Sequence, residues 1–310
     1  MVSFSVIVPN YNHGSFLAER IDSVLNQRYQ NFELILLDDA STDTSREIIE
    51  KYRHHPKVSN IVYNENNSGS TFQQWKKGLE LSCYEWIWIA ESDDKADSGF
   101  LEHCAAVIEQ QRTASLVCVQ SQWINEKGEQ WFMRDTLFEK EGLRPGKEIL
   151  SDFMIHENHI KNASAVVFRR SIINDEEINM ISQYKWCGDW TLWDLLLLKG
   201  DFYFISQPLN YFRRHTDESS RSLYHQGYLY KEGLPLSIAM QKKLSLSFSK
   251  RTRAFISWTG HLFKQYQVNA GRSIFRMYSF PPLYYCILMH LTIPFLGIGI
   301  LIRKTFEKKS

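Results

Sequence analysis

The chain has 310 residues, which is enough for one large domain or two smaller ones with a substantial buried core. Its content of 44% hydrophobic and 23% charged residues is ordinary for a globular protein. The five cysteines are scattered and form no CxxC pair, which excludes a disulfide framework and a cysteine zinc site and fits a reducing cytosol.

The net charge of +1 conceals a strong asymmetry along the chain. Residues 241–310 contain twelve Lys or Arg and one acid, a charge of +11, so the other 240 residues carry −10. An acidic body with a basic tail indicates an anionic partner for the tail, either nucleic acid or the inner face of a membrane.

Short apolar runs alternate with helical patterns as far as about residue 120. The first run begins almost at the first residue, so we expect no signal peptide. Helices are expected to begin at Ser15, at Thr44 (an apparent capping box with Glu47) and at Ser98. The predicted strands span 3–8, 33–37, 60–63, 86–90 and 116–120. This alternation predicts an α/β fold with a mostly parallel, Rossmann-like sheet and helices on both faces.

Three polar clusters directly follow apolar strands: PNYN (9–12), DDAST (38–42) and ESDD (91–94). In a parallel sheet, ligands bind beyond the carboxyl ends of the strands, so all three clusters should line one rim. Carboxylates packed as tightly as those of the third cluster repel each other. A metal ion, a group of basic side chains or water must therefore offset their charge.

The rest of the chain is less regular. Residues 121–220 contain strand-like runs at 165–168 and 202–206 and should complete the sheet and form an acceptor cleft. Residues 283–302 carry no formal charge and would span about 30 Å as a helix, close to the thickness of a bilayer core. The preceding residues, 250–280, mix basic and aromatic side chains, as does a helix in a membrane interface. The alternative is a basic helical pair packed on the core.

The three clusters, in this order and spacing, resemble the motifs of the family 2 glycosyltransferases, which have the GT-A fold. The resemblance covers residues 3–120 well and extends more loosely to about residue 220. It implies that residues 1–120 form the nucleotide-sugar-binding half and residues 121–220 the acceptor-binding half. Residues 221–310 would then form a basic and apolar helical segment that associates with a membrane.

The activity implied by this resemblance is that of an inverting glycosyltransferase of bacterial surface-polysaccharide synthesis. Such an enzyme moves a sugar from a nucleotide-sugar, here a UDP-sugar, to a glycan or lipid-linked acceptor. We therefore expect a cytoplasmic protein associated with the anionic inner face of the cell membrane, and no nucleic-acid partner.

The resemblance also assigns the donor site. The loop of Pro9 and Tyr11 would pack against the nucleotide base, and the alternative is an ordinary turn. Asp39 would accept a hydrogen bond from the uracil imide while Asp38 supports the loop, although acids before a helix are often caps. Ala40 stands where the family often has Gly.

Glu91, Asp93 and Asp94 match the family's DxD-type metal motif, whose oxygen ligands suit Mg²⁺ or Mn²⁺. By resemblance Asp94 is a direct ligand, Asp93 contacts the metal or the ribose, and Glu91 replaces the more usual Asp. His215 would complete the metal or diphosphate site. The alternative for the three acids is a solvated acidic turn without a metal. Possible partners for the phosphate oxygens are Arg213, Arg214 and Arg221.

By the same resemblance Asp189 is the general base that takes the proton of the acceptor hydroxyl. Trp186 and Trp190 flank it and could exclude water or stack on sugar rings. Gly188 stands where many family members have an acid. The alternative is that Asp189 only caps the following apolar helix.

Two other functions are consistent with this pattern. A sugar-phosphate nucleotidyltransferase shares the fold type and the metal requirement, but PNYNHG has a single Gly and no basic residue to hold a triphosphate. A non-catalytic, membrane-associated scaffold would not need to retain acids at positions 39, 93, 94 and 189.

Overall fold

The computed structural model describes residues 1–131, 140–214 and 223–268. The chain is divided into two compact units. The first comprises Met1–Ile149 and His159–Glu218, and the second comprises Leu150–Asn158 and Ser219–Ser310. The predicted sheet, the three clusters and the candidate base all belong to the first unit.

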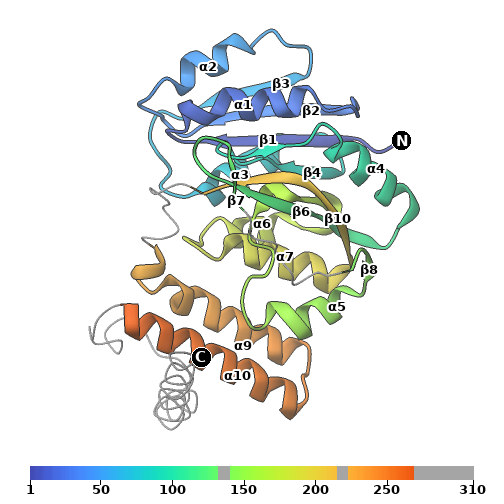
Figure 1. Cartoon of the computed structure of the whole chain (residues 1–310), viewed down its shortest axis with the longest axis vertical. Coiled ribbons are helices and arrows are strands. Elements are labelled where there is room, and N and C mark those ends of the chain that lie inside the picture. Colours follow the sequence, from blue (N-terminus) through green and yellow to red (C-terminus); the bar gives the residue numbers. More distant parts are fainter. Residues whose placement is uncertain (132–139, 215–222, 269–310) are drawn as a thin grey trace, which may run out of the picture. The chain divides into compact units, whose positions relative to one another are not determined.

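The described part of the first unit is built on a ten-stranded sheet with the order β3-β2-β1-β4-β9-β6-β10-β5, to which β7 and β8 pair at the side (Figure 1). The four strands at one side are parallel and nearly all apolar: β1 (Phe4–Asn10), β2 (Phe32–Asp38), β3 (Val58–Tyr63) and β4 (Trp86–Ile89). Every residue of β1, β2 and β4 is buried, as expected for strands covered by helices on both faces.

The rest of the sheet is mixed. The long strands β6 (Ala114–Ile124) and β10 (Asp201–Arg213) run parallel to each other. Between β4 and β6 lies β9 (Val166–Arg169), antiparallel to both. The short strands β5 (Lys95–Ala96), β7 (Gln130–Trp131) and β8 (Gly142–Arg144) pair antiparallel with β10 or β6.

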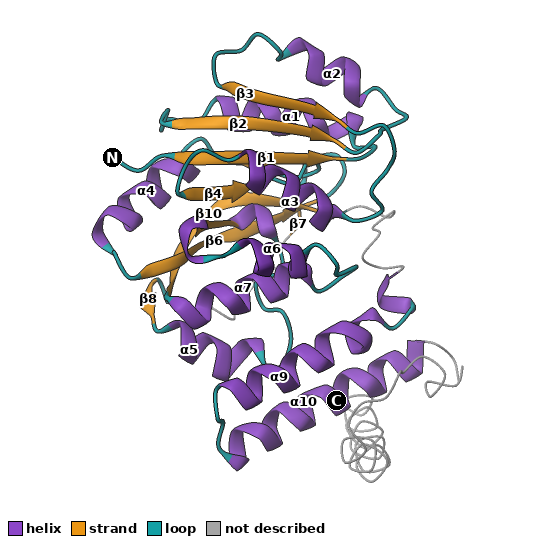
Figure 2. Cartoon of the chain, turned by 180° about the vertical axis from the view of Figure 1, so that it is seen from behind, coloured by secondary structure: helices purple, strands orange, loops and turns teal. Residues whose placement is uncertain are grey.

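Helices cover both faces of this sheet. In Figure 1, α1 (Gly14–Leu25) and α4 (Phe100–Gln110) lie on the face turned to the viewer, and α2 (Ser45–Lys51) packs beside α1. Figure 2 shows α3 (Thr71–Leu81), α6 (Asp175–Ile181) and α7 (Gly188–Lys199) on the opposite face. The one-turn helix α5 (Gly146–Ile149) packs against α7.

The predicted α/β fold with helices on both faces is confirmed. The parallel register also confirms that the three polar clusters share one rim, because Asn10 pairs with Asp38 and Ile7 pairs with Ile89. The sheet is continuous across the position where we expected two halves to meet, since β6 runs through residue 120.

Of the three predicted helix starts, Thr44 is confirmed as an N-cap residue, whereas its capping box and the starts at Ser15 and Ser98 are wrong. None of α1, α2 and α4 has a side-chain hydrogen bond from its N-cap residue, and the N-caps are His13, Thr44 and Gly99. Asp43 instead serves two helices, because its Oδ2 accepts from the Gly14 N–H at 2.8 Å and its Oδ1 from the Ser45 N–H at 3.0 Å. One carboxylate between α1 and α2 thus replaces the two separate caps that the sequence suggested.

The described part of the second unit is helical: η1 (Leu150–Met154), η4 (Leu229–Gly233), α9 (Leu234–Lys243) and α10 (Phe248–Val268). Trp258 is buried in it and donates from Nε1 to the Ile155 carbonyl at 3.0 Å. Over the ranges that the structure describes, no helix has the length and apolar character needed to cross a membrane. The expected apolar segment 283–302 lies outside these ranges.

Candidate active site

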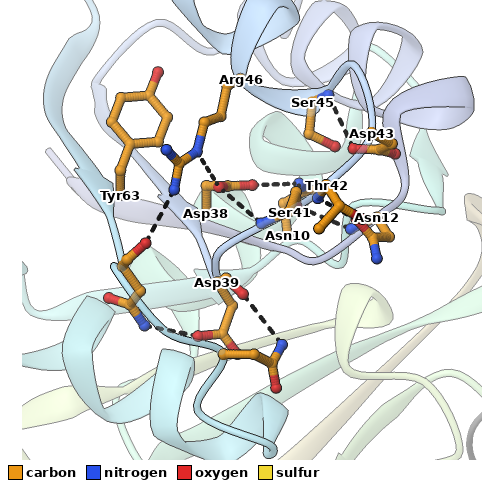
Figure 3. A network of polar contacts seen from close by, with 12 residues as sticks. Asn10, Asn12, Asp38, Asp39, Ser41, Thr42, Asp43, Ser45, Arg46 and Tyr63 are labelled. Atoms are coloured by element: carbon orange, nitrogen blue, oxygen red, sulfur yellow. Dashed lines mark hydrogen bonds and ion pairs between the residues drawn. The ribbon is translucent and has the colours of Figure 1, made fainter.

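The polar loops after β1 and β2 are held together by their own side chains (Figure 3). The Asn10 amide Nδ2 donates to Oδ1 of Asp38 at 3.1 Å. The Asn12 side-chain Oδ1 accepts from the Thr42 N–H at 2.8 Å, and the Asn12 N–H donates to Ser41 Oγ at 2.9 Å. Each loop therefore fixes the shape of the other.

Both loops contain a residue in the left-handed region, Asn12 with φ of 55° and Ala40 with φ of 60°. Asn adopts this conformation readily, whereas the Cβ of Ala costs roughly 1 kcal/mol there. This backbone geometry is the physical reason why Gly would suit position 40. The chain keeps the loop shape with Ala at some cost in stability.

The two acids of the second cluster have different surroundings. Asp38 is fully buried, and its Oδ2 accepts from the Ser41 N–H and pairs with Arg46 Nε, each at 3.2 Å. The guanidinium of Arg46 also lies over the ring of Tyr63. These contacts place Asp38 beneath the loop, as the predicted supporting role requires.

Asp39 is 3% exposed and is surrounded by donors from the segment after β3. Its Oδ1 accepts from Asn64 Nδ2 at 2.7 Å and Gln74 Nε2 at 2.8 Å. Its Oδ2 accepts from the Ser68 hydroxyl at 2.7 Å, and the Ser68 N–H lies 3.0–3.1 Å from both oxygens. Sequence reasoning identified Asp39 but missed these three partners, because polar residues in a loop carry no signal of what they bind.

The predicted base-contact residues lie at the end of β1. Pro9 is buried within the strand, opposite Leu37 of β2. Tyr11 is 46% exposed, just beyond the end of the strand. Of the two, Tyr11 offers an accessible ring face at the rim.

The third cluster lies at the end of β4. Asp94 is 1% exposed, and its oxygens accept from the Arg213 N–H at 2.9 Å and from Asn162 Nδ2 at 2.8 Å. Glu91 accepts from Trp75 Nε1 at 2.8 Å, and Asp93 is half-buried. The structure thus brings the three acids together, but the side chain of Asp94 points into the protein interior.

A buried cation lies among these acids. Arg20 of α1 is fully buried, donates from Nε to the Glu91 carbonyl at 2.8 Å, and stacks on the ring of Trp88. Its Nη1 and Nη2 have no hydrogen-bond partner among the described residues. Arg20 therefore offsets part of the charge of the cluster. This role could not be predicted from the sequence, because an arginine on an amphipathic helix is usually at the surface.

The acids keep protons more tightly than usual. Burial, reinforced by the charge of Asp93, raises the pKa of Glu91 to about 8. The same two causes raise the pKa of Asp94 to about 6, although Arg20 opposes the shift. The cluster is thus short of positive charge, and an incoming cation would relieve the repulsion.

The donor set of this cluster fits Mg²⁺ or Mn²⁺, since it consists of carboxylate oxygens. No group of three or more His, Cys, Asp or Glu within residues 1–131, 140–214 and 223–268 is arranged to hold a metal alone. Mg²⁺ in nucleotide sites is commonly held by one or two carboxylates, with substrate phosphates and water completing the shell. Asp93 and Glu91 suit that kind of shared site.

Asp189 lies in the first turn of α7, where a negative charge complements the helix dipole. Its carboxylate is half-buried and accepts from the Trp190 N–H at 2.7 Å. The N-cap of α7 is Cys187, so Asp189 is not the N-cap residue that the alternative reading required. Trp190 is 2% exposed and packs in the core, which removes it from any sugar contact, whereas Trp186 is half-buried.

The predicted phosphate partners differ in their surroundings. Arg213 is buried, and its guanidinium donates to Glu19 at 2.6 Å and to the Asp93 carbonyl at 2.7 Å, so it is a structural residue. Arg214 is half-buried against Trp123. His215 and Arg221 lie outside the described residues.

Several known proteins are similar to this chain. Glycosyltransferase GlyG of Streptococcus pneumoniae is 38% identical over 98 residues, which cover 32% of each chain. The poly(ribitol-phosphate) beta-N-acetylglucosaminyltransferase TarS of Staphylococcus aureus is 27% identical over 193 residues, 61% of this chain and 31% of TarS. The chain thus spans about a third of the length of the curated relatives that it matches.

The fold has a clear counterpart among solved structures. A crystal structure of S. aureus TarS residues 1–349 in complex with UDP-GlcNAc superposes with a TM-score of 0.63 at 21% identity, covering 86% of this chain and 73% of that chain. The profile of glycosyl transferase family 2 matches residues 5–176, which include the three rim clusters and β9. Because this match covers more than half of the chain, the protein belongs to glycosyl transferase family 2.

Proposed function

We propose that this chain is an inverting glycosyltransferase that moves a sugar from a UDP-sugar to a hydroxyl group of an acceptor. The observation that carries the proposal is the cluster of Glu91, Asp93 and Asp94, in which two acids have a raised pKa at the end of a buried strand. A site so short of positive charge is suited to a cation that a diphosphate shares.

The donor nucleotide would lie along the rim between Tyr11 and the acid cluster. The exposed ring of Tyr11 would stack on the base. We assign the imide N–H of uracil to Oδ2 of Asp39. Among the described residues Oδ1 accepts from three groups, whereas Oδ2 accepts from the hydroxyl and N–H of one residue, Ser68. The UDP-GlcNAc in the TarS crystal structure supports a uridine nucleotide.

Asp93, with Glu91 beside it, would hold Mg²⁺ or Mn²⁺. Sequence resemblance suggested Asp94 as the direct ligand, but the hydrogen bonds to both of its oxygens favour Asp93 for that role and a supporting role for Asp94. When bound, the ion would neutralise the charge that grows on the departing diphosphate.

Asp189 would act as the general base. Its carboxylate would take the proton of the acceptor hydroxyl while that oxygen forms a bond to the anomeric carbon. The bond from the anomeric carbon to the diphosphate oxygen breaks on the opposite side, so UDP leaves and the configuration inverts.

The acceptor is a glycan or a lipid-linked glycan of a bacterial surface polysaccharide. The names of the relatives support this class, since they include a teichuronic acid biosynthesis glycosyltransferase and a poly(ribitol-phosphate) N-acetylglucosaminyltransferase. Such acceptors are assembled at the inner face of the cell membrane, which is where we place this enzyme.

The second unit supplies a surface suited to anionic lipid. On α10, Phe248 is 87% and Ile256 is 53% exposed, and Arg251 and Arg253 are exposed beside them. Exposed apolar and basic side chains on the same helix favour the interface of an anionic membrane. Phe248→Ser with Ile256→Ser should weaken sedimentation with phosphatidylglycerol vesicles, while neither protein sediments with phosphatidylcholine. Unchanged sedimentation would exclude this surface.

A donor screen tests the catalytic proposal. Nucleotide-sugars are added with and without Mn²⁺, and the midpoint of thermal unfolding is measured. We expect UDP-sugars to raise the midpoint more with Mn²⁺ than without it. Asp189→Asn should keep this shift but lose sugar transfer, measured as UDP release with an acceptor glycan.

Other outcomes of this screen identify other functions. Pyrophosphate release from a sugar phosphate and a nucleoside triphosphate would identify a nucleotidyltransferase. If no nucleotide shifts the midpoint, the chain is a non-catalytic scaffold.

A further inference from the structure

Four successive residues in the first turns of α3 contact the candidate site or the segment that leads to Asp189. Phe72 packs against Gly188, next to Asp189. Gln73 donates from Nε2 to the Ser182 carbonyl at 2.9 Å. As described above, Gln74 donates to Asp39 and Trp75 donates to Glu91. No function was assigned to the stretch FQQW from the sequence.

The contact between Phe72 and Gly188 leaves no room for a side chain at position 188. A Cβ built on Gly188 would lie 2.6 Å from Cγ of Phe72, well inside van der Waals contact. The Phe72 ring is 4% exposed and stands edge-on to Trp75 at a centroid distance of 5.1 Å, so it has little space to move aside. This contact explains why the chain has Gly at position 188.

The segment that leads into α7 is fastened to the same region at two further points. Ser70 Oγ donates to the Tyr184 carbonyl at 3.1 Å, and Lys185 Nζ donates to the Gly69 carbonyl at 3.3 Å. These contacts fix the segment from Ser182 to Gly188 to the start of α3. Any displacement of α3 would move Asp189 relative to Asp39 and Glu91.

We propose that the start of α3, Phe72–Trp75, is a positioning element that holds the general base Asp189 in register with the donor-binding acids. Phe72 fixes the position of Asp189 by packing against Gly188. Gln74 fixes the position of Asp39, on the donor side, by its hydrogen bond. This inference rests on the proposed role of Asp189. It predicts that the two sides of one helical turn control different kinetic constants.

Gly188→Ala tests the base side. We expect kcat to fall about 10- to 100-fold, since displacements near 1 Å cost rates of this order, with the donor KM changed less than about threefold. Phe72→Ala opens the space that the new methyl group needs, so Phe72→Ala with Gly188→Ala should recover much of the kcat lost in Gly188→Ala. Gln74→Leu should instead raise the donor KM with a smaller change in kcat.

Gly200→Ala is the matched control, because Gly200 follows the other end of α7 and a Cβ there would also lie 2.6 Å from a side-chain atom, Cβ of Ser115. It should lower the unfolding midpoint while leaving kcat within about threefold. Two results would overturn the inference: kcat unchanged in Gly188→Ala, or no recovery in the double variant.

Hydrogen exchange of residues 187–191 separates this inference from the proposed function, because it needs no activity. Gly188→Ala should speed exchange of these amides, and the double variant should restore protection. If exchange behaves in this way but Asp189→Asn transfers sugar normally, the assignment of the base fails and the packing contact stands. If Asp189→Asn is inactive but exchange in Gly188→Ala is unchanged, the positioning role fails.

Discussion

The pair of acids after β2 and the cluster of acids after β4 lie on one rim but are neutralised differently. Asp38 and Asp39 accept hydrogen bonds from side chains and backbone of the surrounding loops, and Arg46 forms an ion pair with Asp38. In the second group, Asp94 also accepts two hydrogen bonds, whereas Glu91 accepts one from Trp75 among the described residues. The charge of Arg20 is shared among all three acids. The first group is complete as folded, whereas the second lacks positive charge.

This difference indicates where binding energy is available. A carboxylate that accepts several hydrogen bonds from the protein mainly defines the shape of a loop, and it offers a ligand at most one further hydrogen bond, as proposed for Oδ2 of Asp39. A crowded group with raised pKa offers a large gain to an incoming cation. We therefore expect substitutions in the first group to act mainly on stability and donor affinity, and substitutions in the second mainly on metal binding and rate.

The largest expected effect is that of Asp93→Asn. Removing the half-buried carboxylate of the cluster should lower kcat by about 100-fold or more, because the charge growing on the departing diphosphate loses its counter-ion. Mn²⁺ binding, measured by electron paramagnetic resonance, should weaken in parallel. Asp97→Asn is the matched control and should leave both unchanged. Full activity in Asp93→Asn would show that the cluster is only an acidic turn.

Asp39→Asn should act chiefly on stability and donor affinity. The new amide group would face the donors of Asn64, Ser68 or Gln74, so we expect a loss of about 2 kcal/mol in the free energy of unfolding. The donor KM should rise with it. Asp22→Asn, an exposed acid that accepts one hydrogen bond from Tyr52, should cost less than about 0.5 kcal/mol. An equal loss of stability in Asp39→Asn and Asp22→Asn would show that the hydrogen bonds around Asp39 contribute no more than one exposed hydrogen bond.

The acid cluster should make the metal-free protein less stable as pH rises. Glu91 and Asp94 have folded-state pKa values above their unfolded values, so their contribution is fully present below about pH 4 and is lost as pH rises through about 6 for Asp94 and about 8 for Glu91. We expect a loss on the order of 2 kcal/mol between pH 5.5 and 8.5 in a chelator, measured by urea unfolding.

Two further measurements sharpen this result. Added Mg²⁺ should flatten the pH dependence if it binds the ionised cluster, and Glu91→Gln should reduce the slope without metal. Arg20→Met should move the transition to higher pH, since Arg20 lowers the pKa of both acids. A free energy of unfolding that stays constant between pH 5.5 and 8.5 in the chelator would show that the acid cluster does not lack positive charge.

The smallest expected effect is that of Ala40→Gly in the first group. Relief of the left-handed backbone at Ala40 should raise the free energy of unfolding by about 0.5 kcal/mol, after the greater freedom of Gly in the unfolded chain is subtracted. Ala18→Gly within α1 is the control and should lower it by about 1 kcal/mol. A loss of stability in both variants would show that the loop tolerates Ala at no cost.

The sequence was informative where structure is local. Apolar runs of four to seven residues, each ending in polar residues, predicted β1, β2 and β4 and their shared rim. Pairings across long separations were not predictable. The position of β9 between β4 and β6 depends on packing that no local pattern expresses, as does the hydrogen bond from the Arg213 N–H to Asp94, 119 residues apart.

Side-chain roles were harder to predict than elements. Ser15, Thr44 and Ser98 are typical capping residues, but Asp43 takes two caps because α1 and α2 begin side by side. Trp190 follows a candidate catalytic acid yet faces the core, because a helical residue one position on points about 100° away. Arg20 looks like a surface residue until the fold places it under Glu91.

The second unit takes in the short stretch Leu150–Asn158 from between two parts of the first. Within this unit the Ile155 carbonyl accepts from both Ser237 Oγ and Trp258 Nε1, and Met154 and Ile155 are almost fully shielded from solvent. Trimming the chain from its carboxyl end would remove the partners of that stretch and expose apolar side chains and an unpaired carbonyl in the middle of the chain. A shortened protein that precipitates would therefore give no information about lipid attachment, which is better tested by point substitutions on the surface of α10.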